Sequence, residues 1–392
     1  MKNPTQVISI IAPRNGLFRS SLWRRGFLIM GMVLSLGCFV LAPGARAVEP
    51  PPDGGYANYN TAEGMNALFT LTFGLENTAL GYNALYYTTT GSYNTASGYI
   101  ALQKNSTASN NTATGSSALS LNTTGTDNTA HGANALFNNT TGNRNVANGS
   151  SALYSNQTGG DNTATGVNAL YANTADYNTA TGYQALESNT TGSNNTAHGL
   201  NALNANTSGS YNTANGASAL FSNTIGTDNT VEGELALYQN TTGSADTALG
   251  QAALTNNTSG FQNTALGTLA ASNLSTGSNN IAVGFEAGMN LTTGSNNIDI
   301  GDLGVAGESG IIRIGTAATQ TASFIAGING VPVSGAQVTV SSTGQLGTRP
   351  SSARFKEKIK PMDKASEAIF ALEPVTFEYK HQLDSEGALN SD

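Results

Sequence analysis

The sequence predicts a mainly β protein: a parallel β-solenoid or β-roll of 17-residue coils, followed by a small α+β segment at the C-terminus. Two observations carry this prediction. A motif returns about every 17 residues between positions 60 and 301, and a fixed period of this kind indicates stacked structural repeats. The chain also contains 46 glycines, and only 10% of its residues are charged. Such a composition does not support one large globular core, so the chain must fold by stacking thin layers.

Residues 1–47 have the pattern of a secretory signal peptide. A basic segment with four arginines precedes an apolar run of 16 residues at positions 27–42, and the tripeptide Ala45-Arg46-Ala47 is a small-x-small cleavage site. A transmembrane anchor is the alternative, but the run is shorter than the ~20 residues that a spanning helix needs. We therefore expect cleavage before Val48 and a bacterial protein that is secreted or displayed at the cell surface.

Two other export signals are weaker. Arg24 and Arg25 match the core of a twin-arginine signal, although the basic segment alone also explains them. Cys38 lies in a poor lipobox, because Ser35 stands where a leucine is wanted. After the leader we expect a linker at residues 48–59.

Leader removal would leave an acidic chain. The leader holds six of the 16 Lys and Arg residues, so 10 remain against 24 Asp and Glu, and the net charge is −14. It also holds Cys38, the only cysteine, so we expect no disulfide. An acidic surface repels nucleic acid and anionic lipid headgroups. We therefore expect no nucleic-acid partner, and no membrane span once the leader is removed.

The repeat has the consensus N-T-A-x-G-x-x-A-L-x-x-N-T-T-G-S-x, whose residues we call positions 1–17. It occurs fifteen times, and one step is 16 residues long. The coils begin at Asn60, Asn77, Asn94, Asn111, Asn128, Asn145, Asn162, Asn178, Asn195, Asn212, Asn229, Asp246, Asn263, Asn280 and Asn297.

The columns of this repeat have physical meaning. Position 5 is Gly in all fifteen coils, which indicates positive φ or a backbone contact too close for a Cβ. Position 2 is always β-branched, with Thr in twelve coils, and favours extended backbone. Positions 3 and 8 are Ala in thirteen and fourteen coils, and position 9 is Leu in twelve. Small residues at this spacing indicate a narrow interior.

We expect each coil to contain a short strand, a Gly turn, a second short strand and an Asn-Thr-Thr-Gly corner. Stacked coils would form Asn and Thr ladders. A helical hairpin is incompatible with the repeated glycines, and a disordered chain has no reason to keep Leu and Ala in fixed columns. Ordering one coil costs ~1–2 kcal/mol per residue, while its Leu returns only ~1.5–3 kcal/mol. Coils must therefore stack. An exposed column of Leu, often followed by an aromatic residue, would then favour threefold association of parallel chains.

Two blocks near the end of the repeat carry a resemblance. The blocks NNIAVG at residues 279–284 and NNIDIG at residues 296–301 resemble the β-roll heads of trimeric autotransporter adhesins. The resemblance covers residues 60–301 and is loose, because those heads use a different repeat length. It implies an adhesin-like fibre.

The chain changes character after the repeat. Residues 302–350 contain short β runs punctuated by glycines, which predict a β neck. Residues 351–392 are richer in basic residues. Here Asp363 can cap a helix that ends before Pro374, and alternating apolar residues at 375–379 predict a strand.

The motif S-S-A-R-F-K-E-K-I-K-P at residues 351–361, followed by A-L-E-P-V-T-F at residues 371–377, resembles the endosialidase-type intramolecular chaperone of tail-fibre proteins. The resemblance implies a domain that trimerises, guides folding of a β-solenoid and cuts itself off. By position, Ser351 would be the nucleophile and Lys356 its base. The alternative is a loop serine beside a solvated lysine. The family domain continues past this strand, so we expect a truncated form here.

No motif predicts a metal, cofactor or phosphate site. We expect His131 and His198, at position 4, to be exposed. Acidic residues such as Asp228 and Asp246 could hydrolyse a glycoside only as a pair across a cleft.

Three functions stay open at this point. The first is a structural or adhesin-like homotrimeric fibre, with a surface glycan or receptor as possible partner. The second is a cis-acting Ser-Lys endopeptidase that acts once. The third is an ice- or surface-binding solenoid.

Overall fold

The computed structural model describes residues 56–317, 319–325, 338–342 and 344–348. The chain divides into two compact units, residues 1–321 and 322–392, and we describe each by itself. The predicted leader, helix and C-terminal strand lie outside the described residues. Within the described part, no helix is long and apolar enough to cross a membrane.

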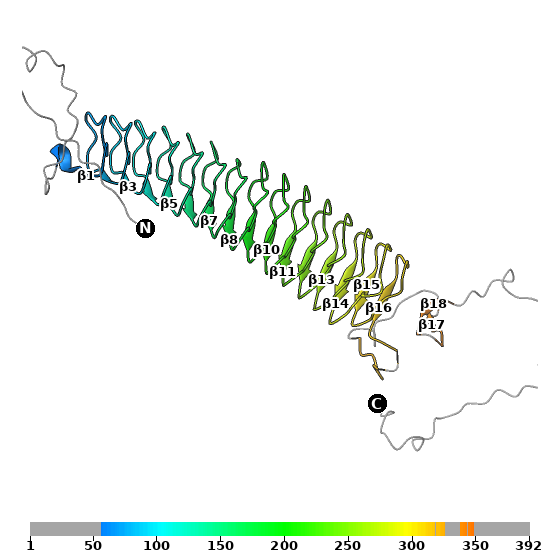
Figure 1. Ribbon diagram of the computed structural model, residues 1–392. Helices are drawn as coiled ribbons and strands as arrows, with labels where there is room; N and C mark the ends of the chain where they lie inside the picture. Colours follow the sequence, from blue (N-terminus) through cyan, green and yellow to red (C-terminus); the bar gives the residue numbers. More distant parts are fainter. Residues whose placement is uncertain (1–55, 318, 326–337, 343, 349–392) are drawn as a thin grey trace, which may run out of the picture. The chain divides into compact units, whose positions relative to one another are not determined.

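The first unit is a parallel β-solenoid (Figure 1). Sixteen strands form one sheet in chain order, each paired in parallel with the next. A short 3-10 turn, η1 (Ala57–Tyr59), precedes them. The strands are β1 (Thr61–Glu63), β2 (Thr78–Leu80), β3 (Thr95–Ser97), β4 (Thr112–Thr114), β5 (Thr129–His131), β6 (Val146–Asn148), β7 (Thr163–Thr165), β8 (Thr179–Thr181), β9 (Thr196–His198), β10 (Thr213–Asn215), β11 (Thr230–Glu232), β12 (Thr247–Leu249), β13 (Thr264–Leu266), β14 (Ile281–Val283), β15 (Ile298–Ile300) and β16 (Ile312–Ile314).

The strand register follows the sequence repeat. Thr61 pairs with Thr78, 17 residues on, and the same step recurs along the sheet. This confirms the predicted solenoid of stacked coils. The sheet then continues one strand past the repeat. This strand, β16, pairs in parallel with β15, and the step between the paired residues is shorter than 17 residues.

Each of the strands β1–β15 is the position 2–4 segment, and its middle residue faces the interior. That residue is Ala in thirteen strands and is almost completely buried in all of them. The residues at positions 2 and 4 point outward, as alternation along a strand requires.

The predicted second strand is wrong. In its place, residues at positions 7 and 9 have positive φ, 60° at Asn66 and 51° at Leu68. The reason is packing, because Ala67 and Leu68 are adjacent and both buried. Successive side chains of a strand point to opposite sides, so two neighbours can face inward only if the backbone changes hand. The segment still bonds to the next coil, since Leu68 N–H donates to the Ala84 carbonyl at 3.1 Å.

The glycine column has both features expected of it. Gly132 has φ of +132°, and a Cβ on it would lie 2.6 Å from the carbonyl carbon of Gly149 in the next coil. Neither the conformation nor the spacing admits a side chain. At position 5, adjacent coils therefore approach too closely for a side chain.

The leucine column is buried inside a single chain. All twelve position-9 leucines are at most 1% exposed. The expectation that this column forms an exposed stripe is wrong, and with it one reason for threefold association. Aromatic residues at position 10 stay at the surface and stack along the axis in short runs, such as Phe137 on Tyr154 with ring centroids 5.4 Å apart.

The interior changes its pattern at the C-terminal end of the solenoid. In most coils Leu occupies position 9 and Asn position 12. In the coil that begins at Asn263, Ala271 and Leu274 fill these positions, and the next coil has Gly288 and Leu291. Both Leu274 and Leu291 are fully buried. The large side chain has moved to the other position, so the interior volume is kept.

The second unit contains a small antiparallel hairpin. Strand β17 (Val338–Val340) pairs with β18 (Leu346–Thr348). Ser341 and Gln345 join the two strands through a backbone hydrogen bond of 2.9 Å.

Candidate functional site

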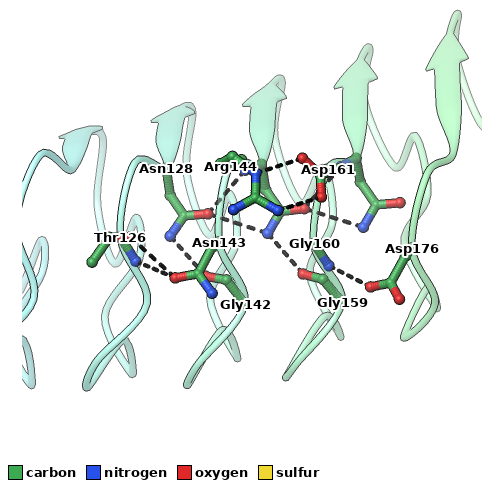
Figure 2. Close-up of polar contacts among 11 residues, drawn as sticks. Thr126, Asn128, Gly142, Asn143, Arg144, Gly159, Gly160, Asp161 and Asp176 are labelled. Carbon is green, nitrogen blue, oxygen red and sulfur yellow. Dashed lines mark hydrogen bonds and ion pairs between the residues drawn. The ribbon is translucent and has the colours of Figure 1, made fainter.

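The interior of the solenoid holds a ladder of asparagines at position 1. Asn145 shows the pattern: its Nδ2 donates to Asn128 Oδ1 at 3.1 Å and to the Gly159 carbonyl at 2.8 Å, and both of these partners are labelled in Figure 2. Its backbone N–H donates to the same Asn128 Oδ1 at 3.0 Å. Each amide thus ties its own corner to the preceding coil, and buried polar groups are satisfied in a repeating manner.

A second ladder of asparagines at position 12 runs beside the first. Asn139 Nδ2 donates to Asn122 Oδ1 at 2.8 Å and to the Gly142 carbonyl at 3.0 Å. Asn128 of the first ladder donates to that same Gly142 carbonyl at 2.9 Å. In coils with both asparagines, the two ladders therefore meet at one corner carbonyl, which belongs to Gly in most coils and to Ala108 or Ala175 in two others. These contacts confirm the asparagine ladders predicted from the stacked repeat, and they show in addition that these asparagines are buried.

The 16-residue coil interrupts the second ladder. Its corner is one residue short, so Asn173 Nδ2 donates to the Ala175 carbonyl only two residues on. Asn173 does not reach back to the preceding coil, and Asn156 Oδ1 is buried without a hydrogen-bond partner. This is the position in the described solenoid where the shortened repeat has a visible structural cost.

Asp246 puts a carboxylate into the first ladder. It is fully buried, and its oxygens accept from the Asn263 backbone N–H at 2.8 Å and from Asn257 Nδ2 at 3.1 Å. Burial raises the pKa of Asp246 to about 7, against hydrogen bonds from Asn263 and Asn257 that lower it. Unlike an asparagine, the ionised group cannot donate to Asn229 or to its own corner.

Asp299 places a second carboxylate in the interior, at position 3 of β15 where other coils have Ala. It is fully buried, and neither of its oxygens has a hydrogen-bond partner. Burial, together with the charges of Glu308 and Asp302, raises its pKa to about 6. Arg313 lies beside it in register on β16 but forms its ion pair with Glu308 at 2.7 Å.

The surface carries few charged contacts in the described residues. Arg144 donates to both carboxylate oxygens of Asp161 in the next coil, each at 2.7 Å (Figure 2). These hydrogen bonds lower the pKa of the Asp161 carboxyl. His131 and His198 are exposed on the outer side of β5 and β9, as predicted.

The predicted catalytic residues Ser351 and Lys356 lie outside the described residues. The possible acid pair of Asp228 and Asp246 is wrong, because Asp228 is exposed and Asp246 is buried in the asparagine ladder. Among the described residues, no group of three His, Cys, Asp or Glu side chains could hold a metal ion.

One comparison with known proteins is informative. Residues 351–391 match the family described as chaperone of endosialidase. No curated protein matches the chain, and no solved structure matches it. The family match confirms the resemblance seen in residues 351–377. Together with the stacked coils, it fits a tail-fibre-like protein that carries an intramolecular chaperone domain.

Proposed function

We propose that the chain is exported and that three copies assemble into a structural fibre, with the solenoid as its body and residues 351–392 guiding assembly. The observation that carries this proposal is the order of the two parts. A long solenoid of near-identical coils is followed by a segment that matches a chaperone family.

Near-identical coils create a folding problem that such a segment can solve. A coil whose strand reads Thr-Ala-Thr can pair with almost any other coil, so the wrong register costs little. Long-range parallel pairing is also slow and exposes strand edges while it forms. A segment that gathers the C-termini of three chains supplies one common starting point, from which coils add in order.

The solenoid itself supports a structural role. Its interior is mainly Ala, Leu and Asn, and position 4 on the outer face of the sheet varies in type from coil to coil. An ice- or surface-binding role would need a regular outer array. Position 2 supplies one Thr column on the outer face of the sheet, but position 4 on the same face varies among Glu63, His131, Asn148 and other types, so this face has no second regular column. The other frequent Thr positions, 13 and 14, lie in the corner and not on the sheet. Freezing-hysteresis measurements on the exported protein test this alternative.

The test is to express the gene with and without the codons for residues 351–392. We expect the full chain to give soluble trimers with β-type circular dichroism. We expect the shortened chain to give little soluble product or a mixture of aggregates. An equal yield of folded protein from both would refute a guiding role for this segment.

A further inference from the structure

The outer side of the sheet changes character along the solenoid. In β1–β11, twenty of the 22 outward positions are polar, and only Leu80 and Val146 are apolar. In β12–β16, eight of the ten outward positions are Ile, Leu or Val, and only Thr247 and Thr264 are polar. We call the outward residues of β12–β16 the apolar sheet face. Figure 1 places these strands together at one end of the stack.

This face is exposed in the single chain. Leu266 and Ile300 are 48% and 40% exposed, and Ile312 and Ile314 on the last strand are 65% and 74% exposed. The residues also form continuous columns, because Leu266 pairs with a Val that pairs with Ile300, and Ile300 pairs with Ile314. A contiguous exposed apolar patch of this kind marks an interaction surface.

Coil formation does not require these apolar residues. Ile281 and Ile298 stand at position 2, where twelve coils carry Thr in the same strand conformation and register. Thr and Ile are both β-branched and both suit a strand. We therefore expect the Ile side chains to contribute to a contact outside the coil and not to the folding of the coil itself.

Charge favours a second copy of the chain as the occupant. The chain is acidic, with a net charge of −8 before any leader is removed, so most of its surface repels another copy. None of the ten outward residues of β12–β16 is charged, whereas β1 and β11 carry outward Glu63 and Glu232. The apolar sheet face is a place where two copies meet without like charges in contact.

The position of the face fits the same occupant. It lies at the end of the solenoid that leads to residues 351–391, whose family is one that trimerises. A segment that gathers three C-termini brings this end of each chain together first, in parallel. We infer that the apolar sheet face is the contact surface between parallel copies of this chain; the number of copies, three, rests on the proposed function.

The first test replaces Ile281, Ile298 and Ile312 with Thr in the full chain. Thr is the usual residue at position 2, where Ile281 and Ile298 stand, and Ile312 is the outward residue that pairs with Ile298 from β16, so the coils should fold unchanged by circular dichroism. Sedimentation should show weaker association, with the dissociation constant raised roughly tenfold for each Ile removed from the contact. Val146→Thr, at the same position in β6, is the control and should associate like wild type. An unchanged dissociation constant in the triple variant would overturn the inference.

The second test uses a single cysteine, since the chain has none after Cys38. Ile300→Cys should give a disulfide-linked pair of chains under mild oxidation, and His131→Cys, at the same position on β5, should not. If Ile300→Cys chains remain trimers but do not link, another segment of the chain covers the face and the inference fails, while the proposed fibre stands. If wild type is a monomer, the trimeric fibre itself fails.

Discussion

At the scale of single residues, Asp246 is the feature with the clearest consequence. Fourteen coils begin with Asn and one begins with Asp, so the ladder receives one carboxylate whose pKa rises from 3.8 to about 7 through burial. The raised pKa means that the folded state holds the proton more tightly than the unfolded state. The free energy of unfolding should then fall as pH rises from about 4 to about 7, and the deficit persists above that range.

We predict that Asp246→Asn stabilises the protein at pH 8 and leaves it nearly unchanged at pH 4. The gap between 3.8 and about 7 corresponds to roughly 4 kcal/mol as an upper figure. Asn also restores the donor that the carboxylate lacks. Thermal unfolding followed by circular dichroism at both pH values measures the difference.

Asp228→Asn is the matched control, because this carboxyl is exposed and should show no such effect. Asp299 is also buried, and its pKa is raised to about 6. The free energy of unfolding of the Asp246→Asn protein should therefore still fall between pH 4 and 6, by a smaller amount. Equal stabilisation by Asp246→Asn at pH 4 and pH 8 would contradict the assigned protonation.

At the scale of the coil, we expect the glycines at positions 5 and 15 to differ in how much stability is lost when each is replaced by Ala. Gly132→Ala forces a side chain into φ of +132° and against the Gly149 backbone, so we predict a loss of at least ~2 kcal/mol. A Cβ on Gly125 would also lie close to backbone, 2.3 Å from the Gly142 carbonyl oxygen, but Gly125 does not have the positive φ of Gly132. One coil already carries Ala108 at position 15, and its carbonyl keeps the usual bonds from Asn94 and Asn105 at 2.9 Å. Because the corner can adjust to Ala in this way, Gly125→Ala should cost less. Urea unfolding of both variants decides; a larger loss at Gly125 would contradict this account.

A second prediction at the scale of the coil concerns the large buried side chain, which lies at position 9 in most coils and at position 12 in the coils that begin at Asn263 and Asn280. Ala271→Leu adds a large side chain beside the buried Leu274 and should destabilise by ~1–3 kcal/mol. Ala271→Leu combined with Leu274→Asn restores the common pattern and should recover most of that loss. A double-mutant cycle by urea unfolding measures the coupling. Additive effects of the two changes would mean that the positions do not share one space.

Some features of the coil could be predicted from the sequence, and others could not. The Gly column predicts a tight turn, the Thr column predicts a strand and the Ala column predicts a narrow interior. The period predicts the register of the strands. The sequence does not show which side of the coil the Leu column faces. Ala67 and Leu68 are adjacent, and both point inward only because the backbone at Leu68 is left-handed. The burial of the corner asparagines was missed for a different reason: stacking predicts the asparagine ladder, but Asn is common in exposed turns, so the sequence does not show that the ladder lies inside the coil.

At the scale of the whole molecule, the chaperone segment was predicted from residues 351–377 and is confirmed by the family match at 351–391. Its chemistry is not part of the described structure, so Ser351 and Lys356 remain a prediction from resemblance. A serine hydroxyl needs a nearby base to attack a peptide bond, and a lysine serves when its pKa is lowered.

If the segment cleaves itself, processing should release a fragment of residues 351–392. Ser351→Ala and Lys356→Ala should each abolish release, because nucleophile and base act as one unit. Ser352→Ala is the control and should be processed normally. Intact mass spectrometry of the folded protein reads the result. Wild-type protein that stays full length after folding would identify the segment as an uncleaved chaperone.

The most direct test of the fibre is the native mass of the exported wild-type protein. The account predicts an assembly of three chains, each beginning near Val48, with a circular dichroism spectrum of β type. A soluble monomer with the same spectrum would contradict it, because the solenoid would then be complete without partners.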